Sequence, residues 1–172
     1  MTAITAPTGR SHVFLALLGA AGMALAVGTA LGFQHIGGYI PCKLCLEQRV
    51  PYYVGIPVML LAALSAALRL PGVVTRGLLL AGGLLMLYGA WLGVYHSGVE
   101  WEWWAGPTDC QAVDLPAAGS GSGGILDQID KVVPPSCTVA AGRFLGLSFA
   151  GWNVIASVFT AAIALTAALR LR

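Results

Sequence analysis

The sequence contains very little charge for its length. Lysine, arginine, aspartate and glutamate make up 9% of its 172 residues, whereas 58% of the residues are hydrophobic. A soluble domain carries about 25% charged residues, so this chain has too few charges to cover a surface that faces water. The small net charge of +2 and the lack of a basic run give no indication of nucleic-acid binding. Lipid is therefore the expected solvent for most of the chain.

Four apolar stretches are long enough to cross a bilayer, which takes roughly 20 helical residues. They lie at about 13–33, 52–68, 77–95 and 144–169. The first is longer than a signal-peptide core of about 7–15 residues, so we interpret it as a retained span. The sequence predicts an all-α membrane protein in which residues 1–172 form a single domain, a bundle of four transmembrane helices.

Acidic residues are missing from one side of these spans. That side has five arginines, namely Arg10, Arg69, Arg76, Arg170 and Arg172. The two loops on the other side, 34–51 and 96–143, hold all seven acidic residues. The positive-inside rule then puts both termini and the turn 70–75 in the cytoplasm and both loops outside. All four cysteines would lie outside, where an oxidising compartment allows disulfides to form.

Small residues recur at the spacing that lets helices approach closely in lipid. Gly28 and Gly32 are four residues apart, as are Gly89 and Gly93. Such pairs allow helix contact where no hydrophobic drive brings helices together. The chain has 23 glycines, however, so their abundance alone explains these spacings equally well.

The first outer loop brings two of the four cysteines close together. Cys42 and Cys45 are separated by two residues, near the start of the second span. Unpaired N–H groups and the macrodipole of a helix start favour a thiolate, so we predict a redox-active pair. Arg49 follows one helical turn after Cys45, where its charge would favour a thiolate or a reduced, anionic acceptor. An arginine that reaches lipid phosphates is the alternative interpretation.

Half of a zinc site is the alternative interpretation of the cysteine pair. Zinc needs four ligands, and the other half would have to come from Cys110 and Cys137. Those two cysteines are 27 positions apart. The histidines His35 and His96 are placed at the membrane edge rather than near a cysteine in the sequence. We therefore expect no metal site.

The second outer loop, 96–143, is too long for a simple connection. Its aromatic residues at 101–104 suit the membrane interface. A glycine- and serine-rich stretch at 117–124 is typical of a flexible linker. The pattern at 125–133 predicts a short amphipathic helix that could lie on the membrane surface. This loop is therefore expected to be partly helical.

The same loop carries the other two cysteines, Cys110 and Cys137. Four cysteines allow three pairings, and a flexible loop would give the access that thiol–disulfide exchange needs. The arrangement suggests a relay in which a soluble thiol attacks the loop pair, which then exchanges with Cys42 and Cys45.

Together these motifs resemble the disulfide bond formation protein B (DsbB) family, over roughly residues 13–169. The Gly/Ser-rich stretch between the loop cysteines is a departure from that family. The matching residues are Phe33-Gln34-His35, Pro41-Cys42-Lys43-Leu44-Cys45 with Arg49, Tyr95-His96 ahead of Cys110, Cys137, and Arg143-Phe144-Leu145-Gly146-Leu147.

The resemblance implies a quinone-dependent protein-disulfide oxidoreductase of the bacterial inner membrane. Such a protein reoxidises a periplasmic thioredoxin-like dithiol oxidase (DsbA-like) and passes two electrons to ubiquinone or menaquinone. By the same resemblance, Cys110 forms the mixed disulfide with the soluble partner, and Cys137 is its mate in the loop.

The resemblance also implies roles at the quinone. Cys45 would contact the quinone, Cys42 would be its exchange partner, and Arg49 would polarise the quinone. His96 corresponds to a family position close to the quinone ring, although an ordinary interfacial histidine is the alternative. No catalytic role is expected for His35.

Two other functions remain open. A vitamin K epoxide reductase-like protein would run similar chemistry in reverse, but there the membrane-proximal pair follows the loop pair, whereas Cys42 and Cys45 come first here. A non-enzymatic four-span scaffold would have two structural disulfides that resist mild reductant and do not exchange.

Overall fold

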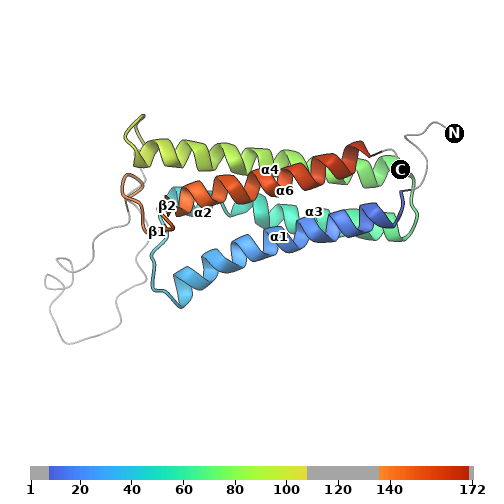
Figure 1. The fold of residues 1–172 in the computed structure, drawn as a ribbon, viewed down its shortest axis with the longest axis horizontal. Helices are drawn as coiled ribbons and strands as arrows, with labels where there is room; N and C mark the ends of the chain where they lie inside the picture. Colours follow the sequence, from blue (N-terminus) through green and yellow to red (C-terminus); the bar gives the residue numbers. More distant parts are fainter. Residues whose placement is uncertain (1–7, 108–135, 171–172) are drawn as a thin grey trace, which may run out of the picture.

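The computed structural model describes residues 8–107 and 136–170. Cys110, the Gly/Ser-rich stretch 117–124 and the amphipathic segment 125–133 lie outside the described residues. The elements are α1 (Arg10–His35), α2 (Lys43–Glu47), α3 (Val50–Ala67), α4 (Gly72–Glu100), β1 (Arg143–Phe144), β2 (Leu147–Ser148) and α6 (Phe149–Leu169) (Figure 1).

The described residues contain four helical segments that are long and apolar enough to cross a membrane. They are α1, α2 continued by α3, α4 and α6. Their axes run side by side along the long axis of the molecule (Figure 1). The predicted all-α fold of four membrane-spanning helices is thus confirmed.

The predicted span 77–95 is too short at both ends, because α4 extends over Gly72–Glu100. Pro71 precedes this helix as its N-cap, and a proline is tolerated there because the first helical N–H groups have no partner within the helix. The turn predicted at 70–75 is therefore mostly helix. At the other end, His96 lies within the last five residues of α4, and its side chain is buried in the bundle.

The predicted fourth span also starts too early, at 144. Arg143 pairs with Ser148 and Phe144 with Leu147 in a small antiparallel hairpin. Both turn residues, Leu145 and Gly146, have positive φ, as a two-residue hairpin turn of this hand requires. Helix α6 begins only at Phe149, where the Ser148 side chain accepts a hydrogen bond from the N–H of Gly151.

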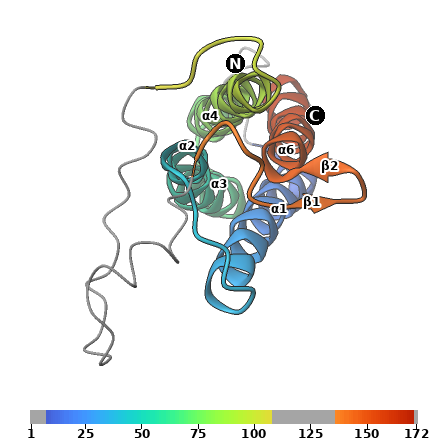
Figure 2. The same ribbon diagram turned by 90° about the vertical axis from the view of Figure 1, so that its left-hand side faces the viewer.

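The four long helices form a ring in which each packs against two neighbours. Helix α1 lies against α3 and α6, and α4 lies against the same two helices (Figure 2). Methionines fill the centre beside glycines: a Cβ on Gly19 or Gly82 would meet Met59, and one on Gly55 would meet Met23. Close packing of small and flexible residues therefore holds the helices together, as lipid requires.

The two glycine pairs differ in their surroundings. A Cβ on Gly89 would meet Ser157 and Pro51, and one on Gly93 would meet Val154 and the carbonyl of Ala150 at 3.2 Å. Gly28 and Gly32 have nothing within 4 Å of such an atom. The interpretation as helix contacts is therefore confirmed for the second pair, which faces α6, and is wrong for the first.

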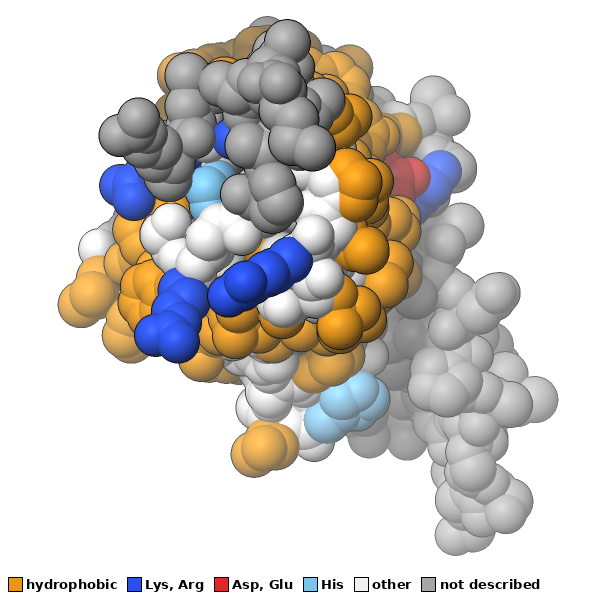
Figure 3. All heavy atoms as spheres, turned by 90° about the vertical axis from the view of Figure 1, so that its right-hand side faces the viewer, with side chains coloured by type: hydrophobic (Ala, Val, Ile, Leu, Met, Phe, Trp, Pro, Cys, Tyr) orange, Lys and Arg blue, Asp and Glu red, His pale blue; other side chains and the backbone are white. Residues whose placement is uncertain are grey.

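The two ends of the bundle carry different charges. Arginine side chains gather around an otherwise apolar or neutral surface at the end where α1 starts and α6 finishes (Figure 3). The described ones are Arg10, Arg69, Arg76 and Arg170. The opposite end carries α2, the hairpin and the described acidic residues, which are Glu47, Glu100 and Glu102.

Candidate active site

Helix α2 places the first cysteine pair at the end of the bundle away from the termini. Cys42 is the N-cap of this short helix, and its sulfur accepts a hydrogen bond from the N–H of Cys45 at 3.3 Å. Both are free thiols. Cys42 is only 2% exposed, whereas Cys45 is half-buried. The local prediction of a cysteine pair at a helix start is confirmed, although α2 spans only Lys43–Glu47.

The two thiols are not equivalent. A hydrogen bond from the Cys42 side chain to that of Cys45, together with burial, raises the pKa of the Cys42 thiol above its usual range. Cys42 therefore keeps its proton at neutral pH. Because a thiolate is the reactive form of cysteine, Cys45 is the better placed of the two to attack or to be attacked.

His96 reaches this pair from α4, across 54 residues of sequence. Its Nε2 lies 3.7 Å from the Cys42 sulfur, and its Nδ1 lies 2.6 Å from the side-chain nitrogen of Gln48. Both Gln48 and His96 are buried. His96 is far from any cysteine in the sequence, and the fold brings it to Cys42. Its distance in sequence from Cys42 concealed the contact.

Glu100 is a second group that the sequence reasoning missed. It follows His96 by one helical turn, and its Oε1 lies 3.9 Å from His96 Nε2, with the side chain only 3% exposed. Ser148 forms a hydrogen bond with this carboxyl group, and the charge of Arg143 acts on it. Its other oxygen, Oε2, is buried without a hydrogen-bond partner. The i, i+4 spacing from a candidate site histidine was the available signal.

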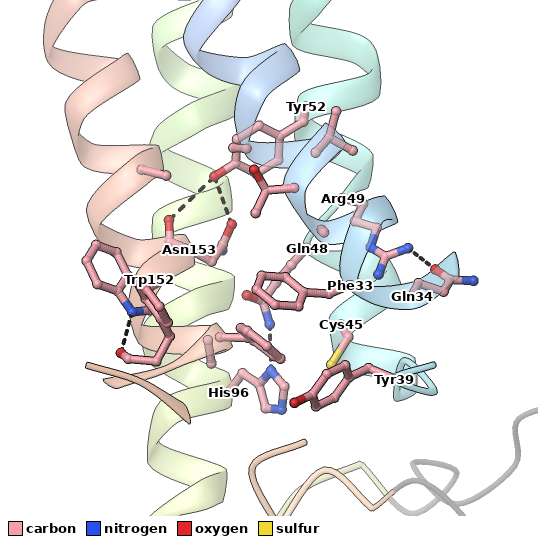
Figure 4. A pocket seen from close by; sticks show the side chains of 18 residues that line it. Phe33, Gln34, Tyr39, Cys45, Gln48, Arg49, Tyr52, His96, Trp152 and Asn153 are labelled. Atoms are coloured by element: carbon pink, nitrogen blue, oxygen red, sulfur yellow. Dashed lines mark hydrogen bonds between the residues drawn. The ribbon is translucent and has the colours of Figure 1, made fainter. Parts of the chain in front are cut away.

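A cavity of about 450 Å³ opens beside Cys45 (Figure 4). Its wall is mostly apolar and comes from α1, the α2–α3 region, α4, the hairpin and α6. Aromatic residues form much of it, namely Phe33, Tyr39, Tyr52, Phe144, Phe149 and Trp152. Small-molecule sites have this character: they enclose about 300–1,000 Å³ and combine apolar walls with a few polar groups.

The polar groups of the cavity gather near the sulfur. Cys45, Gln48, Arg49 and His96 all line it (Figure 4). The Arg49 guanidinium donates a hydrogen bond to the side-chain oxygen of Gln34, and its charge acts on Cys45. Arg49 and Cys45 share this wall, although not on one continuous helix as expected, because α2 ends at Glu47 and Arg49 is the N-cap of α3. Gln34 therefore holds the Arg49 guanidinium in place on the cavity wall.

The deeper wall is braced by a hydrogen-bonded group. The Tyr52 hydroxyl lies 2.8 Å from the side-chain oxygen of Asn153 and 2.7 Å from the Ser157 hydroxyl. The Asn153 side chain also donates to the Gly89 carbonyl at 3.1 Å. These hydrogen bonds join α3, α4 and α6 behind the cavity and so maintain the shape of the cavity.

The remaining predicted site residues fall in different places. Cys137 is disulfide-bonded and 1% exposed, and it packs in one apolar cluster with Cys42, Leu44 and Val99. Cys110 lies outside the described residues. His35 is exposed at the end of α1, and it takes no part in the cluster of cysteines and His96.

The site thus combines a dithiol, a fixed positive charge and an apolar cavity that meets one of the two sulfurs. Cys45 can exchange electrons with a molecule in the cavity while it exchanges disulfides with Cys42. Cys137 shares a buried cluster with Cys42, so a loop cysteine lies close to the first pair, as the relay hypothesis requires.

Comparison with known proteins identifies the family. A family model described as "Disulfide bond formation protein DsbB" matches residues 12–167. A protein named "Disulfide bond formation protein B" from Polaromonas sp. is 29% identical over 169 residues, which cover 91% of this chain and 90% of the relative. A protein of the same name from Chromobacterium violaceum is 33% identical over 148 residues, which cover 81% and 82% of the two chains.

A third relative with this name, from Ralstonia nicotianae, is 44% identical over 87 residues, half of each chain. No solved structure gives a significant match to the chain. The family model covers nearly the whole chain, including Cys42, Cys45, Arg49 and His96. This four-helix membrane protein belongs to the DsbB family of disulfide bond formation proteins.

Proposed function

We propose that this protein is a membrane thiol oxidase that serves a periplasmic thioredoxin-like dithiol oxidase (DsbA-like). It takes two electrons from that partner and transfers them to a quinone of the membrane pool, ubiquinone or menaquinone. The observation that carries the proposal is the position of Cys45 and Arg49 on the wall of one apolar cavity, with the free thiol of Cys42 beside them.

The residues of the cavity fit a quinone ring. Phe33, Tyr39 and Phe149 offer flat apolar faces, while Arg49 and Gln48 offer hydrogen-bond donors at the edge. A quinone bound there would supply the electron sink, because it takes up two electrons and two protons to become a quinol. The protein contributes position and charge.

The dithiol supplies both electrons. Oxidation of Cys42 and Cys45 to a disulfide forms one S–S bond and releases two electrons and two thiol protons, so the exchange balances. Arg49 stabilises negative charge next to Cys45. His96, held through Nδ1 by Gln48, presents Nε2 to the Cys42 sulfur and orients that side chain.

The loop pair would connect this site to the soluble partner. A partner thiolate attacks the disulfide of Cys110 and Cys137, the second partner thiol completes the exchange, and the loop pair is left as a dithiol. That dithiol is reoxidised by the disulfide of Cys42 and Cys45. Two electrons thus move inward at each exchange.

The distribution of charge supports one orientation. The end of the bundle that bears Arg10, Arg69, Arg76 and Arg170 faces the cytoplasm by the positive-inside rule. Both termini then lie in the cytoplasm, and the cysteines lie in the periplasm of a bacterial inner membrane. Membrane lipid surrounds the four spans.

Single-turnover and steady-state assays test the electron path. The purified chain, mixed with a reduced thioredoxin-like oxidase, should consume ubiquinone or menaquinone. We predict that Cys45→Ser abolishes quinone reduction even when the chain is first reduced chemically. Cys110→Ser should block oxidation of the partner but retain quinone reduction by the chemically reduced chain. Turnover of neither quinone, or two disulfides that survive brief dithiothreitol treatment, would favour the structural scaffold.

The role of Arg49 has its own test. Arg49→Gln removes the positive charge beside Cys45, so we predict that kcat/KM for the quinone falls by at least about tenfold. Arg10→Gln, the same change at the exposed opposite end of the bundle, serves as the control and should have no effect. Equal values for the two variants would remove Arg49 from the mechanism.

A further inference from the structure

Three ligand-type atoms converge at the cysteine pair. The sulfurs of Cys42 and Cys45 and a ring nitrogen of His96 all lie within 4.8 Å of one another. Tetrahedral zinc, with bonds of about 2.3 Å to sulfur and about 2.0–2.1 Å to nitrogen, holds such atoms about 3.5–3.8 Å apart. The Cys42 sulfur and His96 Nε2, at 3.7 Å, already have this spacing.

Glu100 lies beside this group, one helical turn after His96, although it is not among the atoms that lie within 4.8 Å of one another. Its Oε1 lies 3.9 Å from His96 Nε2, the atom that also faces Cys42. Its Oε2 is buried and has no hydrogen-bond partner among the described residues. A buried carboxylate oxygen without a partner is costly, and a cation between it and the thiols would remove that cost.

Gln48 contacts the ring nitrogen of His96 that faces away from the cysteines. Its side-chain nitrogen meets Nδ1 of His96 at 2.6 Å. Zinc on the Nε2 lone pair would leave the hydrogen on Nδ1, and the amide of Gln48 would then turn so that its oxygen accepts that hydrogen. A partner on the second ring nitrogen is the usual companion of a metal-bound histidine.

We propose that the dithiol form of this protein binds one zinc ion through Cys42, Cys45 and His96, and that the Glu100 carboxylate moves in to complete the four donors. Binding replaces the two thiol protons, which leave to solvent, and no electron moves. The disulfide form lacks two of the four donors and does not bind. Zinc on both sulfurs prevents their oxidation, so the ion is a reversible inhibitor of the electron transfer. This inhibition, unlike the binding itself, rests on the proposed function.

Zinc suits this donor set better than other common cations. Two thiolates, an imidazole and a carboxylate in a tetrahedral arrangement are typical zinc ligands. Magnesium and calcium prefer sites made only of oxygen, and copper(II) oxidises thiols. The ion expected here is therefore a divalent, borderline-soft cation without redox chemistry of its own.

Direct binding of zinc alone tests the site. The full chain in detergent is fully reduced or oxidised, then dialysed against zinc ions, and the bound metal is counted. We expect one equivalent in the reduced chain that is absent from the oxidised chain and from reduced Cys45→Ser. Glu100→Gln should weaken this binding at least tenfold, whereas Glu102→Gln, the same change on an exposed neighbour, should not.

Several outcomes would overturn the proposal. Zinc retained by Cys45→Ser, or bound equally well by Glu100→Gln and the unchanged chain, would place the ion elsewhere, for instance on the loop cysteines. Circular dichroism of each variant shows whether it is folded. Cobalt(II) gives an independent check, because the intense absorption of a tetrahedral thiolate complex should appear only in the reduced chain.

An activity assay separates this proposal from the proposed function. Zinc should inhibit quinone reduction, a chelator should restore it, and Glu100→Gln should need at least tenfold more zinc for the same fractional inhibition. Quinone reduction that zinc never inhibits would refute the inhibitory zinc site and leave the proposed oxidase function intact. Tight zinc binding by a chain that reduces no quinone would refute the oxidase function and leave the zinc site intact.

Discussion

At the scale of the residue, the two sulfurs of the first pair differ in reactivity because their surroundings differ. Cys42 is buried and its thiol pKa is raised, so at neutral pH, below that pKa, it carries its proton. We predict that iodoacetamide modifies Cys45 of the reduced chain well before Cys42. Peptide mass spectrometry after timed quenching measures the order.

The same experiment contains its control. Cys42 forms little thiolate until the pH approaches its raised pKa, so it should remain the slower residue at moderately alkaline pH as well. In urea the difference should disappear, because unfolding removes both the burial and the hydrogen bond. Equal rates in the folded chain would contradict this account of the site.

Residue-level prediction succeeded where the relevant contact is local in the sequence. Cys45 and Arg49 are only four residues apart and line the same wall, as their spacing predicted, although α2 ends between them. The contact between Cys42 and His96 joins residues 54 positions apart, and the burial of Glu100 depends on residues of the hairpin. The spacing of the sequence did not indicate that the sulfurs of Cys42 and Cys45 lie within 4.8 Å of a ring nitrogen of His96.

At the scale of the element, glycines decide how closely two helices can pack. We predict that Gly93→Val destabilises the bundle by about 1–3 kcal/mol, since its side chain would overlap Val154 and the carbonyl of Ala150 on α6. Gly28→Val makes the same change where nothing lies within 4 Å. Thermal unfolding in detergent compares the two variants, and similar losses would show that helix propensity, not packing, matters.

The elements themselves were largely predictable, but their ends were not. Long apolar stretches identify membrane helices because lipid cannot satisfy unpaired backbone groups. The ends of α4 and the start of α6 depend instead on a capping proline, buried polar residues and a two-residue hairpin. Hydropathy does not detect any of these three features. The predicted helix boundaries are therefore wrong by a few residues, whereas the helices themselves are correctly identified.

At the scale of the whole molecule, the proposed orientation in the membrane rests on the arginine-rich end of the bundle. We predict that a cysteine introduced by Ile36→Cys, in a chain without its native cysteines, reacts with an impermeant maleimide on intact spheroplasts. Leu68→Cys, at the opposite end, should react only after the membrane is permeabilised. Both native side chains are exposed, so a reversed pattern would invert the proposed topology.

Cys137 and Cys42 share one buried apolar cluster, which has a consequence for selectivity. Both residues are almost fully buried, at 1% and 2% exposure. A small thiol in solution, such as glutathione, would have to displace packed side chains to reach either sulfur. If the protein works as proposed, its electrons would therefore come from a docked protein and not from the general pool of small thiols.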